Sequence, residues 1–178
     1  NAQVQKLEQR KNELSSQLNA LKDTADKNEK AAEIAKQNAQ TNGILSGRLA
    51  ATGEGVVIRI SQGSKQKIDS AILFTLLEEL RNSGAEVIEI NNVRVVTSTY
   101  ISGTAGSLVC DGTKLKSPFT IRAIGDSDNL QNAVNLAGGV GSRLKVKYGA
   151  TVSVSPSDKV MIKSTRQAPQ YTYAHVIG

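Results

Sequence analysis

The sequence has too few cysteine, histidine and aromatic residues for several common kinds of functional site. Its 178 residues include one Cys, one His, no Trp, two Phe and four Tyr. A zinc or iron–sulfur centre needs about three or four Cys or His ligands, and a lone Cys cannot form an internal disulfide. We therefore expect no metal site, no cofactor and no disulfide. The hydrophobic core must be built from Ile, Val, Leu and Ala.

Long apolar runs are missing as well. No stretch approaches the ~20 apolar residues that a transmembrane helix requires, and no secretory signal peptide is recognisable. The chain begins with Asn1 rather than Met. We therefore expect an upstream segment, outside these 178 residues, that could carry a membrane anchor.

The positive charge of the sequence is dispersed. A net charge of +6 and a pI of about 9.5 would suit an anionic partner such as nucleic acid or a lipid surface. The one dense run is Arg143, Lys145 and Lys147, whose alternate spacing places all three on one face if the segment is extended. We interpret the excess as a solvated basic surface. The scarcity of aromatic side chains argues against nucleic-acid binding.

Residues 1–42 are predicted to form one long helix, because they contain good helix formers and no Pro or Gly. Apolar residues recur in it with the heptad spacing of a coiled coil, and Lys11 and Asn28 interrupt the seam. This pattern predicts self-association, and the alternative is a helix folded back onto the rest of the chain. The a positions are Val4, Lys11, Leu18, Ala25, Ala32 and Ala39, and the d positions are Leu7, Leu14, Leu21, Asn28 and Ala35.

Three further regions follow the predicted helix. Gly43, Gly47 and Gly53 mark a linker over residues 43–54. Residues 55–164 are predicted to form a globular domain, and residues 165–178 an irregular tail.

Within the globular domain, strands alternate with two helices. The expected elements are a strand over 56–60, a helix over 68–82 that ends at Gly84, strands over 86–90 and 94–100 around a turn at Asn91-Asn92, a hairpin of 107–110 and 114–115 around Asp111-Gly112, a strand over 119–124, a helix over 130–136 capped by Ser127 or Asp128, an extended segment over 140–148, and a hairpin of 151–154 and 160–163 around Pro156-Ser157. This order predicts an α+β sandwich with helices on one face of a sheet, in a split βαβ or ferredoxin-like arrangement with an inserted hairpin.

Three ordered segments resemble the signatures of a bacterial family, the YlxW-like "domain of unknown function 881" group. The first segment is residues 80–95, which read Leu-Arg-Asn-Ser-Gly-Ala-Glu-Val-Ile-Glu-Ile-Asn-Asn-Val-Arg-Val. The second is residues 117–126, Ser-Pro-Phe-Thr-Ile-Arg-Ala-Ile-Gly-Asp, and the third is residues 138–140, Gly-Gly-Val.

The resemblance implies an organisation rather than an activity, because the family has no established one. Its members typically carry an N-terminal membrane anchor, a coiled-coil segment and then this domain on the outer side of the membrane, mostly in Gram-positive bacteria. Some are encoded among cell-division and envelope genes. The implied location is therefore the cell membrane, on its extracytoplasmic side.

Two groups of polar residues are candidate contact sites. Asn91, Asn92 and Arg94 follow a buried strand, and Arg94 could bind a carboxylate or phosphate or could pair with Glu89 or an Asp to fix the turn. The second group is the glycine-rich loop at Gly138 and Gly139, with Arg143 and Lys145 following it; that loop could expose backbone N–H groups to an anion, or could be a simple turn.

No set of residues in the sequence suggests a catalytic site. The single His175 lies in the unpatterned tail, so a Ser-His-Asp triad is not expected, and Glu78 and Glu79 face solvent on a predicted helix. Our hypothesis is a non-enzymatic, membrane-tethered scaffold that binds protein partners and self-associates through its N-terminal helix. The alternative is a small anion- or nucleotide-binding sensor that uses the Gly138 loop.

Overall fold

The computed structural model describes residues 2–178 and divides into two compact units. One unit ends at Asn42, and the other runs from Gly43 to Gly178. Residues 43–54 contain the last turn of helix α1, a turn at Gly47 and the start of strand β1.

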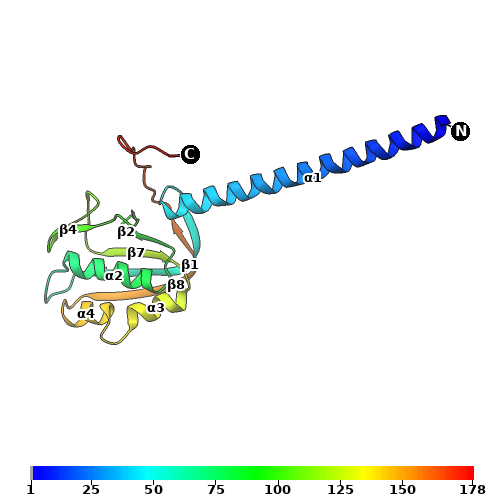
Figure 1. Ribbon diagram of the computed structural model, residues 1–178. Helices are drawn as coiled ribbons and strands as arrows, with labels where there is room; N and C mark the ends of the chain where they lie inside the picture. Colours follow the sequence, from blue (N-terminus) through cyan, green and yellow to red (C-terminus); the bar gives the residue numbers. More distant parts are fainter. Residues whose placement is uncertain (1) are drawn as a thin grey trace. The chain divides into compact units, whose positions relative to one another are not determined.

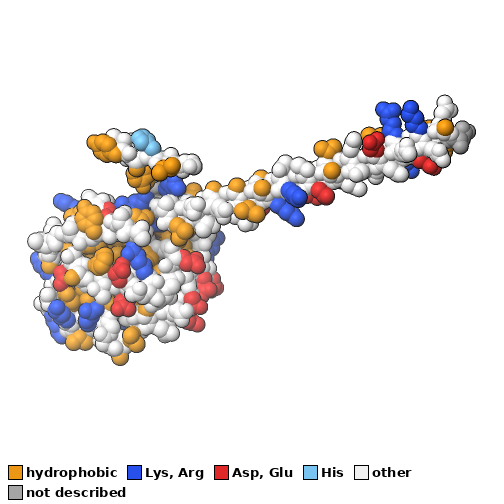
Figure 2. All heavy atoms as spheres, in the orientation of Figure 1, with side chains coloured by type: hydrophobic (Ala, Val, Ile, Leu, Met, Phe, Trp, Pro, Cys, Tyr) orange, Lys and Arg blue, Asp and Glu red, His pale blue; other side chains and the backbone are white. Residues whose placement is uncertain are grey.

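The first unit consists of a single long helix, as the sequence predicted. Helix α1 (Ala2–Leu45) is 44 residues long, and the side chains of its heptad seam are exposed. Figure 2 shows hydrophobic side chains at intervals along α1, between charged ones. The long helix is therefore confirmed, whereas self-association stays a prediction. The most exposed large seam residues are Val4, Leu7, Leu14, Leu18 and Leu21.

The second unit is an α+β domain, as predicted, with helices on one face of an antiparallel sheet (Figure 1). The sheet has five strands in the order β3-β2-β7-β1-β8. The strands are β1 (Ala51–Ser61), β2 (Val87–Ile90), β3 (Val93–Val95), β7 (Phe119–Ile124) and β8 (Thr151–Ile162), and the helices are α2 (Ser70–Asn82), α3 (Ser127–Asn135) and α4 (Val140–Val146).

Strand β7 lies between β1 and β2 and is antiparallel to both, so β1 and β2 run in the same direction. The connection from β1 through α2 to β2 therefore leaves room for one inserted strand, which is the geometry of a split βαβ unit. The assignment to a ferredoxin-like fold stays a prediction.

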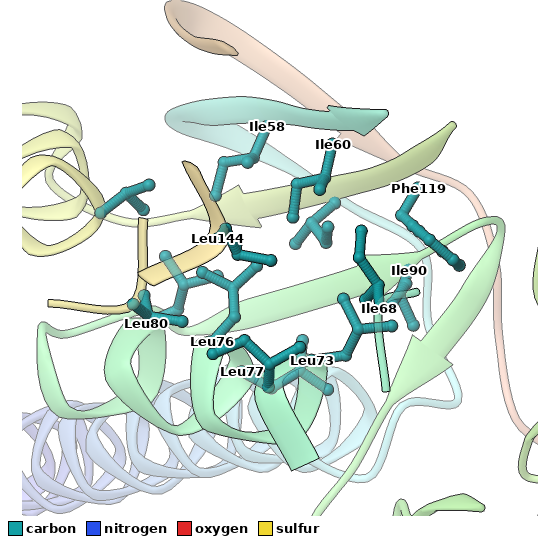
Figure 3. Packing of buried hydrophobic residues seen from close by; sticks show 14 of the residues in the cluster. Ile58, Ile60, Ile68, Leu73, Leu76, Leu77, Leu80, Ile90, Phe119 and Leu144 are labelled. Carbon is teal, nitrogen blue, oxygen red and sulfur yellow. The ribbon is translucent and has the colours of Figure 1, made fainter. Parts of the chain in front are cut away.

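The core lies between the helices and one face of the sheet (Figure 3). Helix α2 contributes an amphipathic stripe of five buried aliphatic side chains, and alternate residues of β1 point toward it. Burial of each such side chain stabilises the fold by about 1.5–3 kcal/mol. The α2 stripe is Ile72, Leu73, Leu76, Leu77 and Leu80, and its β1 partners are Val56, Ile58 and Ile60.

A second, three-stranded sheet is inserted between β3 and β7. It comprises β4 (Ile101–Thr104), β5 (Ser107–Cys110) and β6 (Thr113–Lys114). Asp111 and Gly112 have φ values of 46° and 85°. Both values are positive, as the two central residues of a type I′ turn require. The predicted hairpin at Asp111-Gly112 is therefore confirmed.

The segment after the second glycine turn differs from its prediction. Residues 140–146 form α4 rather than an extended segment, because Val140 and Leu144 lie one helical turn apart and are both buried. Arg143, Lys145 and Lys147 are spaced at alternate positions, so in a helix the three side chains cannot all lie on one face. Helix α3 is also longer than predicted, and its N-cap is Asp126, whose carboxylate accepts a bond from Asn129 N–H.

Two strand predictions also require correction. Strand β8 is continuous from Thr151 to Ile162 and pairs with β1 along its length, so the predicted hairpin around Pro156 does not form. Pro156 is tolerated because β8 is an edge strand of the sheet. Pro lacks a backbone N–H, and on an edge strand no second neighbouring strand needs that donor. Strand β3 ends at Val95, since Val96 N–H bonds the Thr99 hydroxyl in a turn.

A polar contact fixes the start of α2 to the end of α4. Asp69 is the N-cap of α2, accepts a bond from Ile72 N–H at 2.9 Å, and accepts another from Tyr148 Oη at 2.7 Å. Burial opposes ionisation of Asp69, but these bonds and the charge of Lys147 outweigh it and hold the pKa of the carboxyl below its usual value. Burial and the bond to Asp69 raise the pKa of Tyr148 to about 12.

We predict that Tyr148→Phe lowers the free energy of unfolding by about 1.5–3 kcal/mol at pH 7, because a bond to a charged group is lost. The depressed pKa of Asp69 means that its contribution is present above the unfolded-state pKa of about 3.9 and is lost as the pH falls through the lower folded-state pKa. Urea unfolding at pH 7 and below pH ~4 should therefore show a smaller difference between variant and wild type in acid. Tyr100→Phe removes the same hydroxyl from an exposed side chain and should have no effect. Equal losses in both variants would contradict the assignment.

Candidate functional site

The face of the sheet opposite the helices carries a row of charged side chains. Register places Glu89 of β2 between Arg94 of β3 and Arg122 of β7, and Arg122 opposite Val57 of β1. Strand alternation sends all four side chains to the same face, away from the helix-covered core. This face therefore has a charged row, whereas the buried side chains of the strands on the opposite face are apolar.

Glu89 is buried between two arginines. Its exposed fraction is 3%, and its Oε2 accepts a bond from Arg122 Nη1 at 3.1 Å. Arg122 is about one-third exposed and thus faces both Glu89 and solvent. An unpaired carboxylate at this depth would cost several kcal/mol, so the two cations are a condition for its burial.

Arg94 is itself buried, with an exposed fraction of 2%. Its guanidinium donates to the carbonyl oxygens of Ile44 at 2.9 Å, Leu49 at 2.9 Å and Ser164 at 3.0 Å. Burial lowers the pKa of Arg94, and the charge of Glu89 opposes that shift. These contacts support a structural role for Arg94 rather than ligand binding. Its three bonds connect the last turn of α1, the residues just before β1 and the segment after β8.

Arg166 extends the same set of contacts. Its backbone N–H donates to Gly47 O at 2.7 Å, and its Nε donates to Arg94 O at 2.8 Å. Its Nη2 forms an ion pair with Asp111 of the inserted hairpin. The first residues of the irregular tail are therefore fixed to the globular unit. Beside this pair, burial raises the pKa of the Cys110 thiol, and the charge of Arg166 opposes the shift.

A groove of about 430 Å³ lies on the charged face, and we call it the basic groove. It contains three cations and one carboxylate, with an apolar side formed by two valines and a methionine. The lining residues are Val57, Glu89, Asn92, Arg122, Lys159, Val160, Met161 and Lys163.

The three predicted contact residues near the β2–β3 turn have different surroundings. Asn91 is committed to structure, because its Oδ1 accepts from Thr120 N–H at 2.8 Å and its Nδ2 donates to Lys116 O at 2.9 Å. Asn92 is exposed and lines the basic groove. The φ values of Asn91 and Asn92 are 44° and 63°, a left-handed pair that Asn tolerates better than most residues.

The second predicted group is not assembled into one site. Gly138 has a φ of 77° and Gly139 caps the N-terminus of α4, whereas Arg143 and Lys145 belong to the last turn of the same helix. Cations at that end favourably complement the helix dipole. Their positions support a role for Gly138 and Gly139 as a turn.

Sequence reasoning missed four residues that line the basic groove: Glu89, Arg122, Lys159 and Lys163. The alternation in residues 119–124 gives Arg122 a position on the polar face, and the same alternation in residues 87–90 applies to Glu89. Lys159 and Lys163 had no such signal, because β8 was expected to be a hairpin.

The described part of the chain lacks two further kinds of feature. From Ala2 to Gly178, no group of three or more His, Cys, Asp or Glu residues is arranged to hold a metal ion. Over the same residues, no helix is both long and apolar enough to span a bilayer.

Comparisons with known proteins identify relatives without a described activity. A family model for a bacterial protein of unknown function, DUF881, matches residues 38–175. UPF0749 protein Rv1825 of Mycobacterium tuberculosis is 34% identical over 169 residues, which are 93% of this chain and 57% of the relative. UPF0749 protein YlxW of Bacillus subtilis is 30% identical over 126 residues, which are 66% of this chain and 54% of the relative.

A solved structure is also similar. The crystal structure of an uncharacterized conserved protein from Mycobacterium tuberculosis matches with a TM-score of 0.71 and 35% identity, covering 79% of this chain and 99% of that one. The chain spans a little over half the length of the curated relatives named above.

We predict that Arg94→Met destabilises the globular unit by about 3–5 kcal/mol, because Glu89 loses a neighbouring cation and three carbonyls lose their donor. Arg94→Lys should retain the charge but not the planar array of donors, and should recover only part of the loss. Arg59→Met removes the same group from an exposed position of β1 and serves as the control. Urea unfolding would measure all three variants, and a loss below about 1 kcal/mol for Arg94→Met would contradict the central role of Arg94.

Proposed function

The chain belongs to the DUF881 family of bacterial proteins, and from that premise we propose that it is a non-enzymatic scaffold that self-associates through α1 and binds protein partners with its α+β unit. The proposal places the protein at the cell membrane, on the extracytoplasmic side, in cell-envelope or cell-division processes.

The exposed heptad seam of α1 carries the proposal. Leu14, Leu18 and Leu21 occupy successive d, a and d positions and are 54–68% exposed. Helices in proteins gain most of their stability from packing an apolar face against another element, so a seam of this kind favours pairing with a second copy. In such a pair, each Leu would insert between side chains of the facing helix.

Further observations favour a non-enzymatic role for the α+β unit. Arg94 binds backbone carbonyl oxygens and Tyr148 binds Asp69, which favours structural roles for these ionisable groups. The relatives of this chain are named without an activity. The membrane tether would be supplied by parts of the full-length protein that this chain does not span.

We predict that the chain is a dimer or higher oligomer at tens of micromolar, and that Leu14→Gln with Leu21→Gln weakens association at least tenfold. Gln has nearly the helix propensity of Leu, so the double variant removes the seam and not the helix. Sedimentation equilibrium would measure association, and circular dichroism would check helicity. Ser16→Gln with Asp23→Gln introduces the same residues on the opposite heptad face and should leave association unchanged. A monomeric wild-type chain would contradict the scaffold proposal.

The extracytoplasmic location predicts that a cysteine on the surface of the α+β unit reacts with a membrane-impermeant maleimide in intact cells. Lys145 is exposed, so Lys145→Cys in the full-length protein, expressed in its own cell, provides the reporter. The native Cys110 is buried and its pKa is raised, so the unmodified protein should give little background. Labelling of Lys145→Cys only after lysis would place the domain on the other side of the membrane.

A further inference from the structure

We propose that the basic groove binds a phosphate-type dianion, such as the phosphomonoester or diphosphate group of a small molecule or of a lipid headgroup. The groove lies in the α+β unit, so this proposal does not depend on self-association through α1.

The cations of the basic groove have unused hydrogen-bonding capacity. Arg122 directs one nitrogen, Nη1, to Glu89, and its Nε and Nη2 bond no other group within residues 2–178. Lys159 and Lys163 are exposed, and neither has a carboxylate within 4.0 Å in the same part of the chain. The single acid of the groove, Glu89, is already engaged. The groove therefore has a net positive charge with donors available to a ligand.

The donors of the basic groove come from more than one segment of the chain. Arg122 projects from β7, Lys159 lies in the last part of β8, and Lys163 follows β8 directly. A carboxylate is satisfied by one planar guanidinium, whereas a tetrahedral phosphate with two charges can accept from a guanidinium and two ammonium groups at once. Asn92 adds a neutral amide at the edge of the groove. Donors of three kinds on separate segments favour the phosphate.

The basic groove is preorganised on its Arg122 side. Glu89 is almost fully buried and is held by the sheet, so its bond fixes the Arg122 guanidinium before any ligand arrives. Preorganisation of this kind lowers the entropic cost of binding. A volume of about 430 Å³ lies within the range of small-molecule sites, and Val57, Val160 and Met161 provide an apolar side for the organic part of a phosphate ester.

Calorimetric titration of the full chain with pyrophosphate tests the proposal. Lys159→Ala with Lys163→Ala should weaken binding at least tenfold. These lysines are exposed, so the variant should keep its thermal unfolding temperature. Lys114→Ala with Lys145→Ala removes two exposed lysines outside the groove and should bind as the wild type does. Absence of pyrophosphate binding at millimolar concentration would overturn the proposal unless the vesicle test below is positive. Equal weakening in both double variants would overturn it outright, since net charge alone would then explain the affinity.

A second arm distinguishes the sources of the phosphate. Co-sedimentation with vesicles of phosphatidic acid in phosphatidylcholine, compared with phosphatidylcholine alone, would report a lipid headgroup. Binding to the anionic vesicles that is lost in Lys159→Ala with Lys163→Ala, and kept in the control pair, supports a lipid ligand. Binding of pyrophosphate without vesicle binding supports a soluble ligand. Failure of both probes contradicts the proposal and leaves the scaffold proposal untouched.

Discussion

The guanidinium of Arg94 holds together the parts of the globular unit that are farthest apart in sequence. Three carbonyl oxygens, from Ile44, Leu49 and Ser164, converge on a side chain that is nearly without contact to water. A desolvated cation is stable only when its donors are satisfied and a counter-charge lies near, and Glu89 on the next strand supplies the charge. Because Glu89 also binds Arg122, the position of Arg94 affects the entire charged row.

The two faces of the sheet are consequently built on different physical principles. Aliphatic packing under α2, α3 and α4 stabilises one face, and it tolerates exchanges of similar volume. The other face carries the ion pair of Glu89 with Arg122 beside the buried Arg94, and removal of Arg122 would leave the buried Glu89 without its ion-pair partner. The charged face also has a small aliphatic cluster, of Val87, Ile124, Val160 and Ile162, beside the row. The unengaged donors of Arg122, Lys159 and Lys163 lie on this second face.

Local patterns in the sequence predicted the elements that depend on local physics. The stripe of α2 and the Asp111-Gly112 turn were predicted because their spacing and turn chemistry determine the conformation directly. Strand β8 was not predicted as one continuous strand, because Pro156 is typical of a turn. Only its pairing with β1 along the full length shows that the strand continues through Pro156. Helix α4 was not predicted because its seven residues contain two buried aliphatic side chains, Val140 and Leu144, which are too few to distinguish the period of a helix from that of a strand.

The same distinction applies to the candidate sites. Asn92 was identified from its own turn, whereas Lys159 and Lys163 join Arg122 only through the pairing of β8 with β1, whose register shifts between Gly53 and Gly55. No local pattern encodes such a convergence. At the Gly138 loop the relation is reversed, because Arg143 and Lys145 are near the loop in sequence but lie in the last turn of the helix that Gly139 begins.

The bond between Gly47 O and Arg166 N has a mechanical consequence. At 2.7 Å, it brings the segment through which the chain enters the globular unit against the segment through which the chain leaves it. About 120 residues are therefore folded between two points that almost touch. A tension applied along the chain would be borne across this short bridge and the adjacent Arg94 contacts, and not along the strands of the sheet. Within the globular unit, residues 47 and 166 are therefore joined directly, and separating them requires this bridge to break.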